Sequence, residues 1–506
     1  MSDPVRIALE PLGRELTVKR GTPLRDILFA QGVEFPCGGR GRCKGCRIRL
    51  AAGVLPVSED DARLLAPREL ANGWRLACRA RASDDLCIEL AQWEATILAD
   101  DSTFSIRPRE GLGIAIDLGT TTIVAQLLDL RTGRVLAVRT ALNAQARHGA
   151  DIMSRIEFAV HGGGADALAK LTREQIGALA GELIAAADAD PRELRDVVLV
   201  GNTAMHHLFC GIDPTPLAAH PFESSHDTLR IFSARELGWS AADGASVRFL
   251  PGLGSFVGSD LLAGVLATKM HESAAPAVLV DLGTNGEIVV GNRDRLLCAS
   301  TAAGPAFEGA RISCGMRAAT GAISEVTIAG GRLECSVIGQ TAPRGLCGSG
   351  LVDAVACALD LGLVRPDGRL PDGRPLALES PVELSQGDIR ELQLAKGAIT
   401  AGIRILLRQW GAAPDEVAHV WLAGAFGNYI NRGSARRIGL IDFPPEKVVA
   451  AGNTALLGAK LALFDLDAED GSHGAIRART AHVSLNEDPE FIDIYVAEMG
   501  FPAAAV

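Results

Sequence analysis

Apolar and polar residues alternate over short runs in the first 95 positions, which is the pattern of half-buried strands. The segments RIALE and RELTVK predict a hairpin, TPLRDILFAQG a short helix, and CRIRL and LCIEL two further strands. A glycine-rich stretch, FPCGGRGRCKGC, separates the helix from the third strand. The pattern therefore predicts a small α+β domain over residues 1–95, built around a loop.

A different pattern begins after a polar linker at about residues 96–110. The chain reads IAIDLGTTTIVAQLLDL, and 164 residues later the theme returns as VLVDLGTNGEIVVGN. Each copy predicts two apolar strands joined by an exposed turn, and each is followed by an apolar strand that runs into glycine, DVVLVGNTAMHH or HVWLAGAFGNYI. This internal repeat predicts two α/β lobes, at about residues 111–275 and 276–506. Part of the first lobe is expected as a middle domain that forms a homodimer.

Composition excludes several classes of protein. Eleven cysteines, an odd number, spread through 506 residues fit a reducing cytoplasm better than a disulfide framework. We expect no membrane span and no secretion signal, because no apolar run reaches the required length. A net charge of -11 argues against a nucleic-acid partner, since phosphate neutralisation needs clustered Lys and Arg.

Four cysteines of the first domain have the spacing of metal ligands: Cys37, Cys43, Cys46 and Cys78. A C-x5-C-x2-C run with a remote fourth cysteine is close to the pattern of plant-type 2Fe-2S proteins. Zinc is the alternative, although zinc ribbons usually have two short C-x2-C pairs. Cys87 competes for the fourth position but alternates with apolar residues in a predicted strand. The segment resembles 2Fe-2S ferredoxins of the longer, adrenodoxin-like spacing, which implies a β-grasp fold.

Basic residues flank this loop: Arg40, Arg42, Lys44, Arg47 and Arg49. They could dock an acidic redox partner, or they could form an ordinary solvated rim, and the sequence leaves both readings open.

The repeated Asp-Leu-Gly-Thr turn has the chemistry of a phosphate loop. Glycine lets backbone N–H groups approach phosphate oxygens, threonine adds hydroxyl donors, and aspartate can hold Mg²⁺ through water. The residues concerned are Asp117, Gly119, Thr120, Thr121 and Thr122 in the first copy, and Asp281, Gly283 and Thr284 in the second. Two such loops can close on a phosphate from both sides.

The order of strands and glycines resembles the actin, sugar kinase and Hsp70 superfamily, in which two ribonuclease-H-like lobes close on ATP. A glycine after a single strand would be only a turn. The resemblance implies phosphate loops at 117–122 and 281–286 and an adenosine site at 424–427. It thereby adds Gly201, Asn202, Asn285, Gly286, Gly424, Ala425 and Gly427 to the nucleotide-binding residues.

Two further motifs, TAAGPAFEGARISCG and RGLCGSGLVDAVA, predict a glycine-rich loop that leads into a helix. Glu308 and Asp353 are expected near these helix starts, either to orient the attacking water or, as we favour, to stabilise the helix terminus. Asp117, Asp281 and Glu308 are the catalytic candidates. Asp260 has a similar setting, and a role at a hinge or at magnesium stays open.

A ferredoxin joined to such an ATPase, together with ALNAQARHGADIMSRI, GPAFEGA and LAGAFGNYI, resembles the reductive activators of corrinoid proteins. The resemblance covers essentially the whole chain. It implies that Cys37, Cys43, Cys46 and Cys78 hold a 2Fe-2S cluster, and that ATP drives one electron onto a partner's cobalt(II) corrinoid to restore cobalt(I). Electrons are expected from a separate low-potential reductase, since no dinucleotide fingerprint is present.

Three other functions remain open at this stage. The lobes could phosphorylate a small metabolite under control of a redox-sensing ferredoxin. The protein could gate electrons to another enzyme, as the activators of 2-hydroxyacyl-CoA dehydratases do, although those hold a 4Fe-4S cluster between two subunits. It could also be a scaffold that turns over no ATP. The sequence does not identify the corrinoid protein served.

Overall fold

The structure is a computed structural model that describes residues 4–10, 14–29, 41, 46–90, 106–149, 151–161, 163–220, 222–223, 226–240, 244–283, 285–466 and 471–503. The chain folds into two compact units. One contains residues 1–95, 120–123 and 141–172, and the other contains 96–119, 124–140 and 173–506. The predicted phosphate turn of the first copy thus contributes residues to both units.

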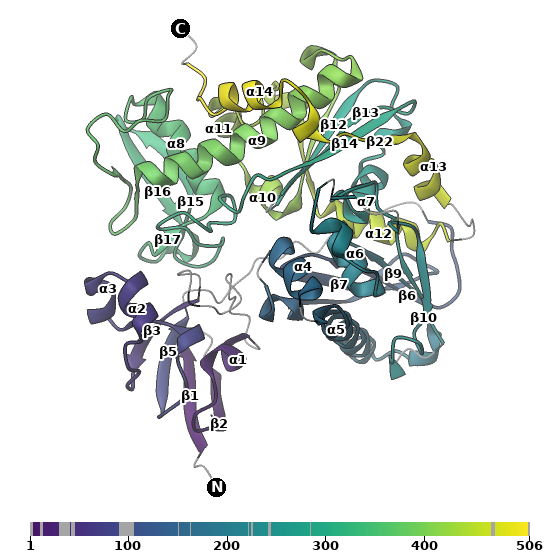
Figure 1. The fold of residues 1–506 in the computed structure, drawn as a ribbon, viewed down its shortest axis with the longest axis horizontal. Helices are drawn as coiled ribbons and strands as arrows, with labels where there is room; N and C mark the ends of the chain where they lie inside the picture. Colours follow the sequence, from purple (N-terminus) through teal and green to yellow (C-terminus); the bar gives the residue numbers. More distant parts are fainter. Residues whose placement is uncertain are drawn as a thin grey trace. The chain divides into compact units, whose positions relative to one another are not determined.

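The N-terminal region is a mixed five-stranded sheet of order β2-β1-β5-β3-β4 (Figure 1). Its predicted hairpin, helix and two later strands are all present, and apolar residues such as Ile7 and Ile48 are completely buried. The elements are β1 (Pro4–Glu10), β2 (Arg14–Lys19), α1 (Leu24–Phe29), β3 (Arg47–Ala52), α2 (Glu59–Leu64), α3 (Pro67–Ala71), β4 (Trp74–Leu76) and β5 (Leu86–Leu90). The parallel pairing of β1 with β5 closes this β-grasp sheet.

The sequence repeat appears as two six-stranded sheets, β10-β11-β9-β6-β7-β8 and β21-β20-β12-β13-β14-β22. Five strands have the same order in both sheets, and the sixth extends opposite edges, β10 next to β11 and β22 next to β14. The first comprises β6 (Leu112–Leu118), β7 (Thr122–Asp129), β8 (Val135–Leu142), β9 (Leu194–Val200), β10 (Arg230–Ser233) and β11 (Ser246–Phe249). The second comprises β12 (Ala277–Leu282), β13 (Gly286–Gly291), β14 (Leu296–Thr301), β20 (Val420–Ala423), β21 (Val448–Gly452) and β22 (Thr480–His482). The central strands are almost entirely buried because their parallel neighbours and helices cover both faces.

Helices follow equivalent strands in the two halves. The first half has α4 (Ile152–Val160), α5 (Gly164–Ala186), α6 (Thr203–Cys210) and α7 (Ser259–Thr268). The second half has α8 (Gly348–Asp360), α9 (Gln386–Trp410), α10 (Gly424–Tyr429), α11 (Arg432–Arg437), α12 (Thr454–Leu463), α13 (Gly471–Arg479) and α14 (Phe491–Glu498). The second half also carries a small sheet of β15 (Ala322–Ala329), β16 (Arg332–Val337) and β17 (Gly345–Leu346), and a hairpin of β18 (Leu376–Ala377) and β19 (Glu383–Leu384).

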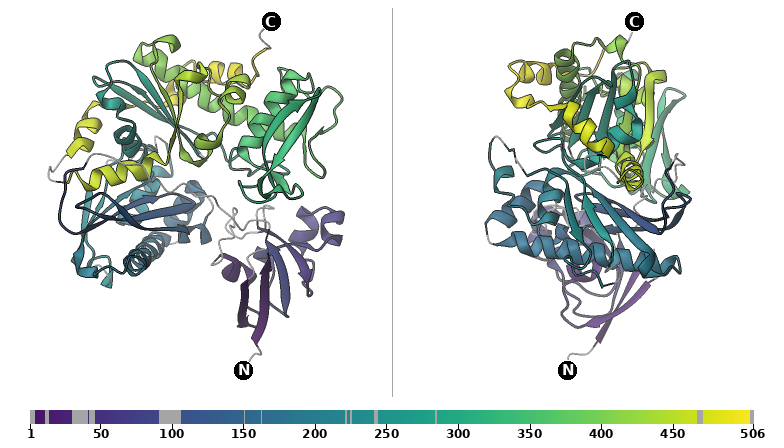
Figure 2. Two further views of the ribbon diagram at one scale, coloured as in Figure 1. Left: turned by 180° about the vertical axis from the view of Figure 1, so that it is seen from behind. Right: turned by 90° about the vertical axis from the view of Figure 1, so that its right-hand side faces the viewer.

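Helices α7 and α12 pack against each other and cross between the two halves. Helix α12 follows the second sheet but packs on β6 and β9 of the first, while α7 contacts β12 and β13 of the second. The left view of Figure 2 shows the yellow-green α12 along the blue strands of the first sheet. The approach is close, since a Cβ on Gly458 would lie 2.1 Å from the carbonyl oxygen of Ala263. One apolar core therefore joins both halves.

Within the described residues, no helix is long and apolar enough to cross a membrane.

Candidate functional site

The described part of the cysteine loop brings the third and fourth predicted ligands together. The N–H of Ala77 donates to the carbonyl oxygen of Cys46 at 3.0 Å, which places Cys78 next in the chain to a direct partner of Cys46. Cys46 is buried and Cys78 is half-buried. Cys87 lies in β5, where it pairs with Ala8 and Ala52 inside the sheet. The geometry thus favours Cys78 over Cys87, and its role as a ligand stays a prediction.

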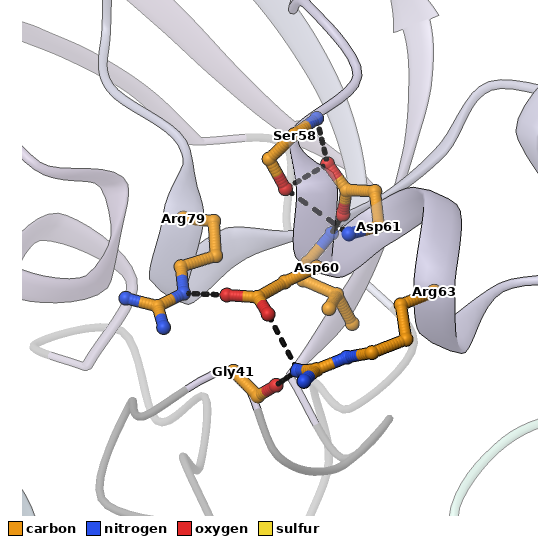
Figure 3. A network of polar contacts seen from close by, with 7 residues as sticks. Gly41, Ser58, Asp60, Asp61, Arg63 and Arg79 are labelled. Carbon is orange, nitrogen blue, oxygen red and sulfur yellow. Dashed lines mark hydrogen bonds and ion pairs between the residues drawn. The ribbon is translucent and has the colours of Figure 1, made fainter.

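A polar network connects α2 with Gly41 and with Arg79 (Figure 3). Asp60 accepts from Arg79 and from Arg63, each at 2.5 Å, and Arg63 also donates to the carbonyl oxygen of Gly41 at 2.7 Å. Asp61 is almost completely buried, and it accepts from the N–H of Leu76 at 2.7 Å. Because Leu76 and Arg79 bracket Cys78, the network fixes the backbone around that cysteine relative to Gly41.

Gly41 is required by both its conformation and its surroundings. Its φ of +67° lies in the left-handed region, and a Cβ there would be 2.4 Å from the Asp60 carboxylate. Cys37 and Cys43 lie outside the described residues, so the full ligand set is not defined. Within the described residues, no group of three or more His, Cys, Asp or Glu side chains is placed to hold a metal ion.

The basic run beside the loop is partly neutralised. Arg47 forms an ion pair with Glu69 at 3.0 Å and lies over the ring of Trp74, and Arg49 pairs with Glu89. Arg40, Arg42 and Lys44 lie outside the described residues. The two described members therefore serve the sheet, which favours the reading as a structural rim for this part of the run.

The two Asp-Leu-Gly segments occupy equivalent positions in the two sheets. Asp117 pairs with Val200 on a parallel neighbour, and Asp281 pairs with Ala423 in the same way. The residue after each partner is a glycine, Gly201 or Gly424. A Cβ on Gly201 would lie 2.6 Å from the carbonyl oxygen of Leu118, and one on Gly424 would lie 2.7 Å from Asp281 Oδ1. Both predicted glycines are thus required by close approach to the neighbouring aspartate strand.

The structure gives different kinds of information about the other predicted nucleotide-binding residues. At Gly283 an added Cβ would meet nothing nearer than 3.6 Å, so local packing does not explain this glycine. Asn202 caps α6 by accepting from the N–H of Met205 at 3.0 Å. Thr284 lies outside the described residues, as does the side chain of Ala425. Their binding roles stay predictions.

Four carboxyl groups lie around the strand ends. Burial, with Asp281 as a like charge, raises the pKa of Asp117 to about 7, although a hydrogen bond from Asn453 opposes this. Burial raises the pKa of Asp281 to about 6. Burial and the charges of Asp281 and Asp117 raise the pKa of Asp260 to about 7. Burial, Asp260 and Asp281 raise the pKa of Glu287 well above its usual value. The four groups are not placed to ligate one metal ion directly, so a divalent cation near them would be held through water, and its charge would offset the repulsion.

The sequence alone does not show how three residues of this cluster, Glu287, Asp260 and Asn453, come together. Glu287 pairs with Asp281 across two antiparallel strands, a contact that period-2 alternation alone does not reveal. Asp260 is placed by Ser259, whose N–H donates to the carbonyl oxygen of Gly201 at 2.9 Å. Asn453 donates from Nδ2 to Asp117 at 3.1 Å across 336 positions of the chain. The Asp260 setting at the start of α7 was predicted, whereas Asn453 was not.

The prediction of a helix after TAAGPAFEGA was wrong. Residues 302–321 form turns instead, because Gly304 and Gly309 have φ of +80° and +76° and Gly315 folds back onto the carbonyl of Gly309. Glu308 therefore lies in a turn and not at a helix start, and no finding tests its catalytic role. Helix α8 does follow RGLCGSG as predicted, but Asp353 lies one turn inside it, where the N–H of Val326 donates to its carboxylate at 3.4 Å.

The glycine-rich motifs of the second half nevertheless meet. Phe307 of GPAFEGA stacks on Phe426 of LAGAFGN with ring centroids 4.7 Å apart. A Cβ on Gly348, at the start of α8, would lie 2.1 Å from the carbonyl oxygen of Phe307. These motifs therefore form one packed surface beside the Asp281 strand.

His206 and His207 make structural contacts. Both are buried in α6, and their rings bond to the backbone carbonyls of Thr228 and Thr203. Burial lowers the pKa of His206 to about 3, so the ring is neutral at physiological pH.

Comparisons with known proteins agree with this architecture over the whole chain. Three family models match successive regions: a 2Fe-2S iron-sulfur cluster binding domain at residues 7–83, the RACo middle region at 112–273, and the C-terminal ASKHA domain of RACo at 275–506. ASKHA denotes the actin, sugar kinase and Hsp70 type of ATPase fold. Both predicted fold types, the 2Fe-2S ferredoxin and the two-lobed ATPase, are thereby confirmed.

Two relatives and one solved structure each match most or nearly all of the chain. The corrinoid activation enzyme RamQ of Eubacterium limosum is 36% identical over 98% of this chain and 99% of its own length. A [Co(II) methylated amine-specific corrinoid protein] reductase of Methanosarcina barkeri is 28% identical over 77% of each chain. A solved structure titled reductive activator for corrinoid,iron-sulfur protein covers 99% of both chains, with 26% identity and a TM-score of 0.69.

Proposed function

Because the chain belongs to the RACo family of corrinoid activators, we propose that it uses ATP to drive single electrons from a 2Fe-2S cluster onto the oxidised cobalt of a partner corrinoid protein. The end-to-end similarity to a corrinoid activation enzyme carries this proposal. Each domain alone would fit other functions, whereas the ferredoxin, middle region and ATPase occur together in that relative.

The chain's own residues fit the cluster. A 2Fe-2S centre bound by thiolates supplies one electron at a time. Cys37, Cys43, Cys46 and Cys78 would hold it, and the approach of Cys46 to the segment of Cys78 supports this set. Asp60 holds Arg79 directly and Gly41 through Arg63, so these two residues keep their positions while electrons enter and leave.

ATP is needed because reduction of cobalt(II) to cobalt(I) is uphill from ordinary donors. For one electron, about 59 mV corresponds to a tenfold change in equilibrium constant, so a gap of a few hundred millivolts requires several powers of ten. Closure of the two lobes on ATP can supply this only if the closed form binds one state of the partner better. We propose that closure grips the corrinoid protein in a form that is easier to reduce, and that hydrolysis releases it.

Within the ATPase, the loops at 117–122 and 281–286 would bind the phosphates, and Asp117 and Asp281 would hold Mg²⁺, with Asp260 and Glu287 beside them. The raised pKa values of these carboxyl groups support a cation, since a 2+ charge would let all of them ionise. Glu308 remains a candidate for orienting water. An external low-potential reductase as electron source, and a homodimer formed through the middle region, are further parts of this proposal.

The test is reduction of a purified cobalt(II) corrinoid protein of a methyltransferase system, with chemically reduced activator at stoichiometric concentration. Cobalt(I) is followed by its visible absorption with MgATP, without nucleotide, and with a nonhydrolysable ATP analogue. We expect extensive reduction only in the sample that contains MgATP. Equal reduction in all three samples would remove ATP from the uphill step, and ATP consumption that depends on a small metabolite instead would indicate a kinase.

A further inference from the structure

A fully buried arginine lies beneath the first phosphate turn. Arg155 of α4 has 0% of its surface exposed, and it belongs to the ALNAQARHGADIMSRI motif, to which no role has yet been assigned. Its Nη2 donates to the carbonyl oxygen of Thr120 at 2.5 Å, its Nε to that of Gly149 at 2.9 Å, and its Nη1 to Gln145 Oε1 at 3.4 Å. One guanidinium thus ties the turn to the segment before α4.

A second tether acts on the next peptide of the turn. The N–H of Asn143 donates to the carbonyl oxygen of Thr121 at 2.8 Å. Asn143 is itself fixed, because its Oδ1 accepts from the N–H of Gln145 at 3.0 Å, and both side chains are completely buried. Gln145 donates onward to the carbonyl oxygen of Leu168 at 3.1 Å. The tethers therefore rest on a buried network and not on mobile side chains.

Because the peptide group is planar, these contacts also fix the direction of the N–H groups of Thr121 and Thr122. In a trans peptide the C=O and the following N–H point to opposite sides. The carbonyl of Thr120 points to Arg155, so the N–H of Thr121 points away from Arg155. The carbonyl of Thr121 points to Asn143, so the N–H of Thr122 points away from Asn143. Backbone N–H groups that point out of a turn can bind an anion.

We infer that Arg155 is a positioning residue for ATP, which turns the N–H group of Thr121 toward the phosphates through the carbonyl of Thr120, while Asn143 acts in the same way on the N–H of Thr122. The inference rests on the proposed nucleotide site. A buried guanidinium is costly unless its donors are paired, and here the acceptors include backbone carbonyls, one of them in the phosphate turn itself. If Arg155 only stabilised the fold, its loss would weaken the binding of adenosine and of ATP alike. If it positions the phosphate turn, its loss weakens the binding of ATP alone.

The experiment compares Arg155→Met with the wild-type full-length protein by calorimetric titration with MgATP and with adenosine. We expect Arg155→Met to bind MgATP about tenfold or more weakly, as for loss of one charge-assisted hydrogen bond, and to bind adenosine as the wild type does. Ser154→Ala is the matched control, because it removes the 2.6 Å hydrogen bond to Asp151 from the same helix without touching the turn. It should leave both affinities unchanged.

The outcomes distinguish failure of the positioning role of Arg155 from failure of the proposed function. If the wild type itself does not bind MgATP, the proposed function fails. If the wild type binds and Arg155→Met binds equally well, or if it loses adenosine and MgATP in proportion, the positioning role is overturned while the proposed function stands. Should Arg155→Met not fold, Arg155→Lys replaces it. Lysine lacks the forked donors that hold Thr120 and Gly149 together, so MgATP affinity should fall several-fold, and wild-type affinity would overturn the inference.

Discussion

At the scale of single residues, the carboxyl cluster has the strongest electrostatic consequence. Asp117, Asp260, Asp281 and Glu287 come from four separate places in the chain, and the pKa of each is raised by burial. Three of them are also affected by like charges. Without a cation, these groups therefore hold protons near neutral pH that ordinary carboxyl groups have released.

The cluster predicts an unusual pH dependence of stability. Folded Asp117 and Asp260 have pKa values of about 7, whereas an unfolded aspartate titrates near 4, so the folded state binds more protons between these values. For these groups, raising the pH through this window releases protons from the folded state and lowers its stability. The free energy of unfolding of the nucleotide-free protein, measured with urea, should therefore fall between about pH 4 and pH 7.

Asp260→Asn is the variant that isolates this effect. It removes one carboxyl group, and should raise the free energy of unfolding at about pH 8 by about 1–2 kcal/mol and flatten the pH profile. Mg²⁺ should stabilise the wild type at the same pH more than it stabilises this variant. A variant profile as steep as that of the wild type would contradict the electrostatic interpretation.

In the ferredoxin domain, Gly41→Ala should impair assembly of the cluster. The new Cβ would lie 2.4 Å from Asp60 and 2.5 Å from Arg79, so the ion pair beside Cys78 in the chain would have to shift. Gly21→Ala is a matched control, since Gly21 has a similar φ of +87° but nothing within 4 Å of an added Cβ. After anaerobic reconstitution, visible absorption per protein should drop in Gly41→Ala and persist in Gly21→Ala. Equal absorption would show that the loop tolerates displacement of Arg79.

At the scale of elements, the sequence predicted what depends on local pattern. The DLGT repeat and the strands that run into Gly201 and Gly424 were visible because apolar runs and glycines mark them directly. The turns at 302–321 were not predicted, since positive φ at Gly304 and Gly309 ends a helix that the composition allows. Asn453 was missed because its contact with Asp117 joins residues 336 positions apart. Period and spacing carry no signal for such a pair.

The same limit applies to the crossing helices. Each of α7 and α12 is apolar along its length, which predicts burial but not the partner. The partner is decided by small residues, where Gly458 lets α12 approach Ala263 and Gly264 lies against Leu279. Tertiary packing, and not helical propensity, thus determines how the two halves are joined.

Gly458→Ala should therefore destabilise the joint between the halves. The Cβ would lie 2.1 Å from the carbonyl oxygen of Ala263, and backbone cannot yield as a flexible side chain can. We expect the free energy of unfolding to fall by about 1–3 kcal/mol, as for other overpacked cores, and ATP turnover to fall with it. Chemical denaturation measures the first and phosphate release the second.

The control for this substitution is Gly387→Ala in α9. Its Cβ would meet nothing nearer than 3.5 Å, so the change should instead stabilise by up to about 1 kcal/mol through helix propensity. If both variants behaved alike, close packing of α7 on α12 would not be the cause.

At the scale of the whole molecule, electron delivery and nucleotide use should be separable. Cys78→Ser should lose the cluster and all reduction of the corrinoid protein, yet bind MgATP with wild-type affinity. Asp281→Asn should keep the visible spectrum of the cluster while ATP-dependent reduction falls by about tenfold or more, because a proposed ligand of Mg²⁺ is lost. Spectroscopy, titration and reduction assays on both variants test this. Loss of both properties in either variant would mean that the domains depend on each other for folding.

The crossing of α7 and α12 also bears on how this gene could be divided. Each half takes part of its apolar covering from a helix encoded by the other, so a chain cut between α7 and β12 yields two fragments with bare hydrophobic faces. Such fragments would be soluble only as complements of each other. A split version fused to inducible dimerisation tags would place the supply of active cobalt under the control of an added drug.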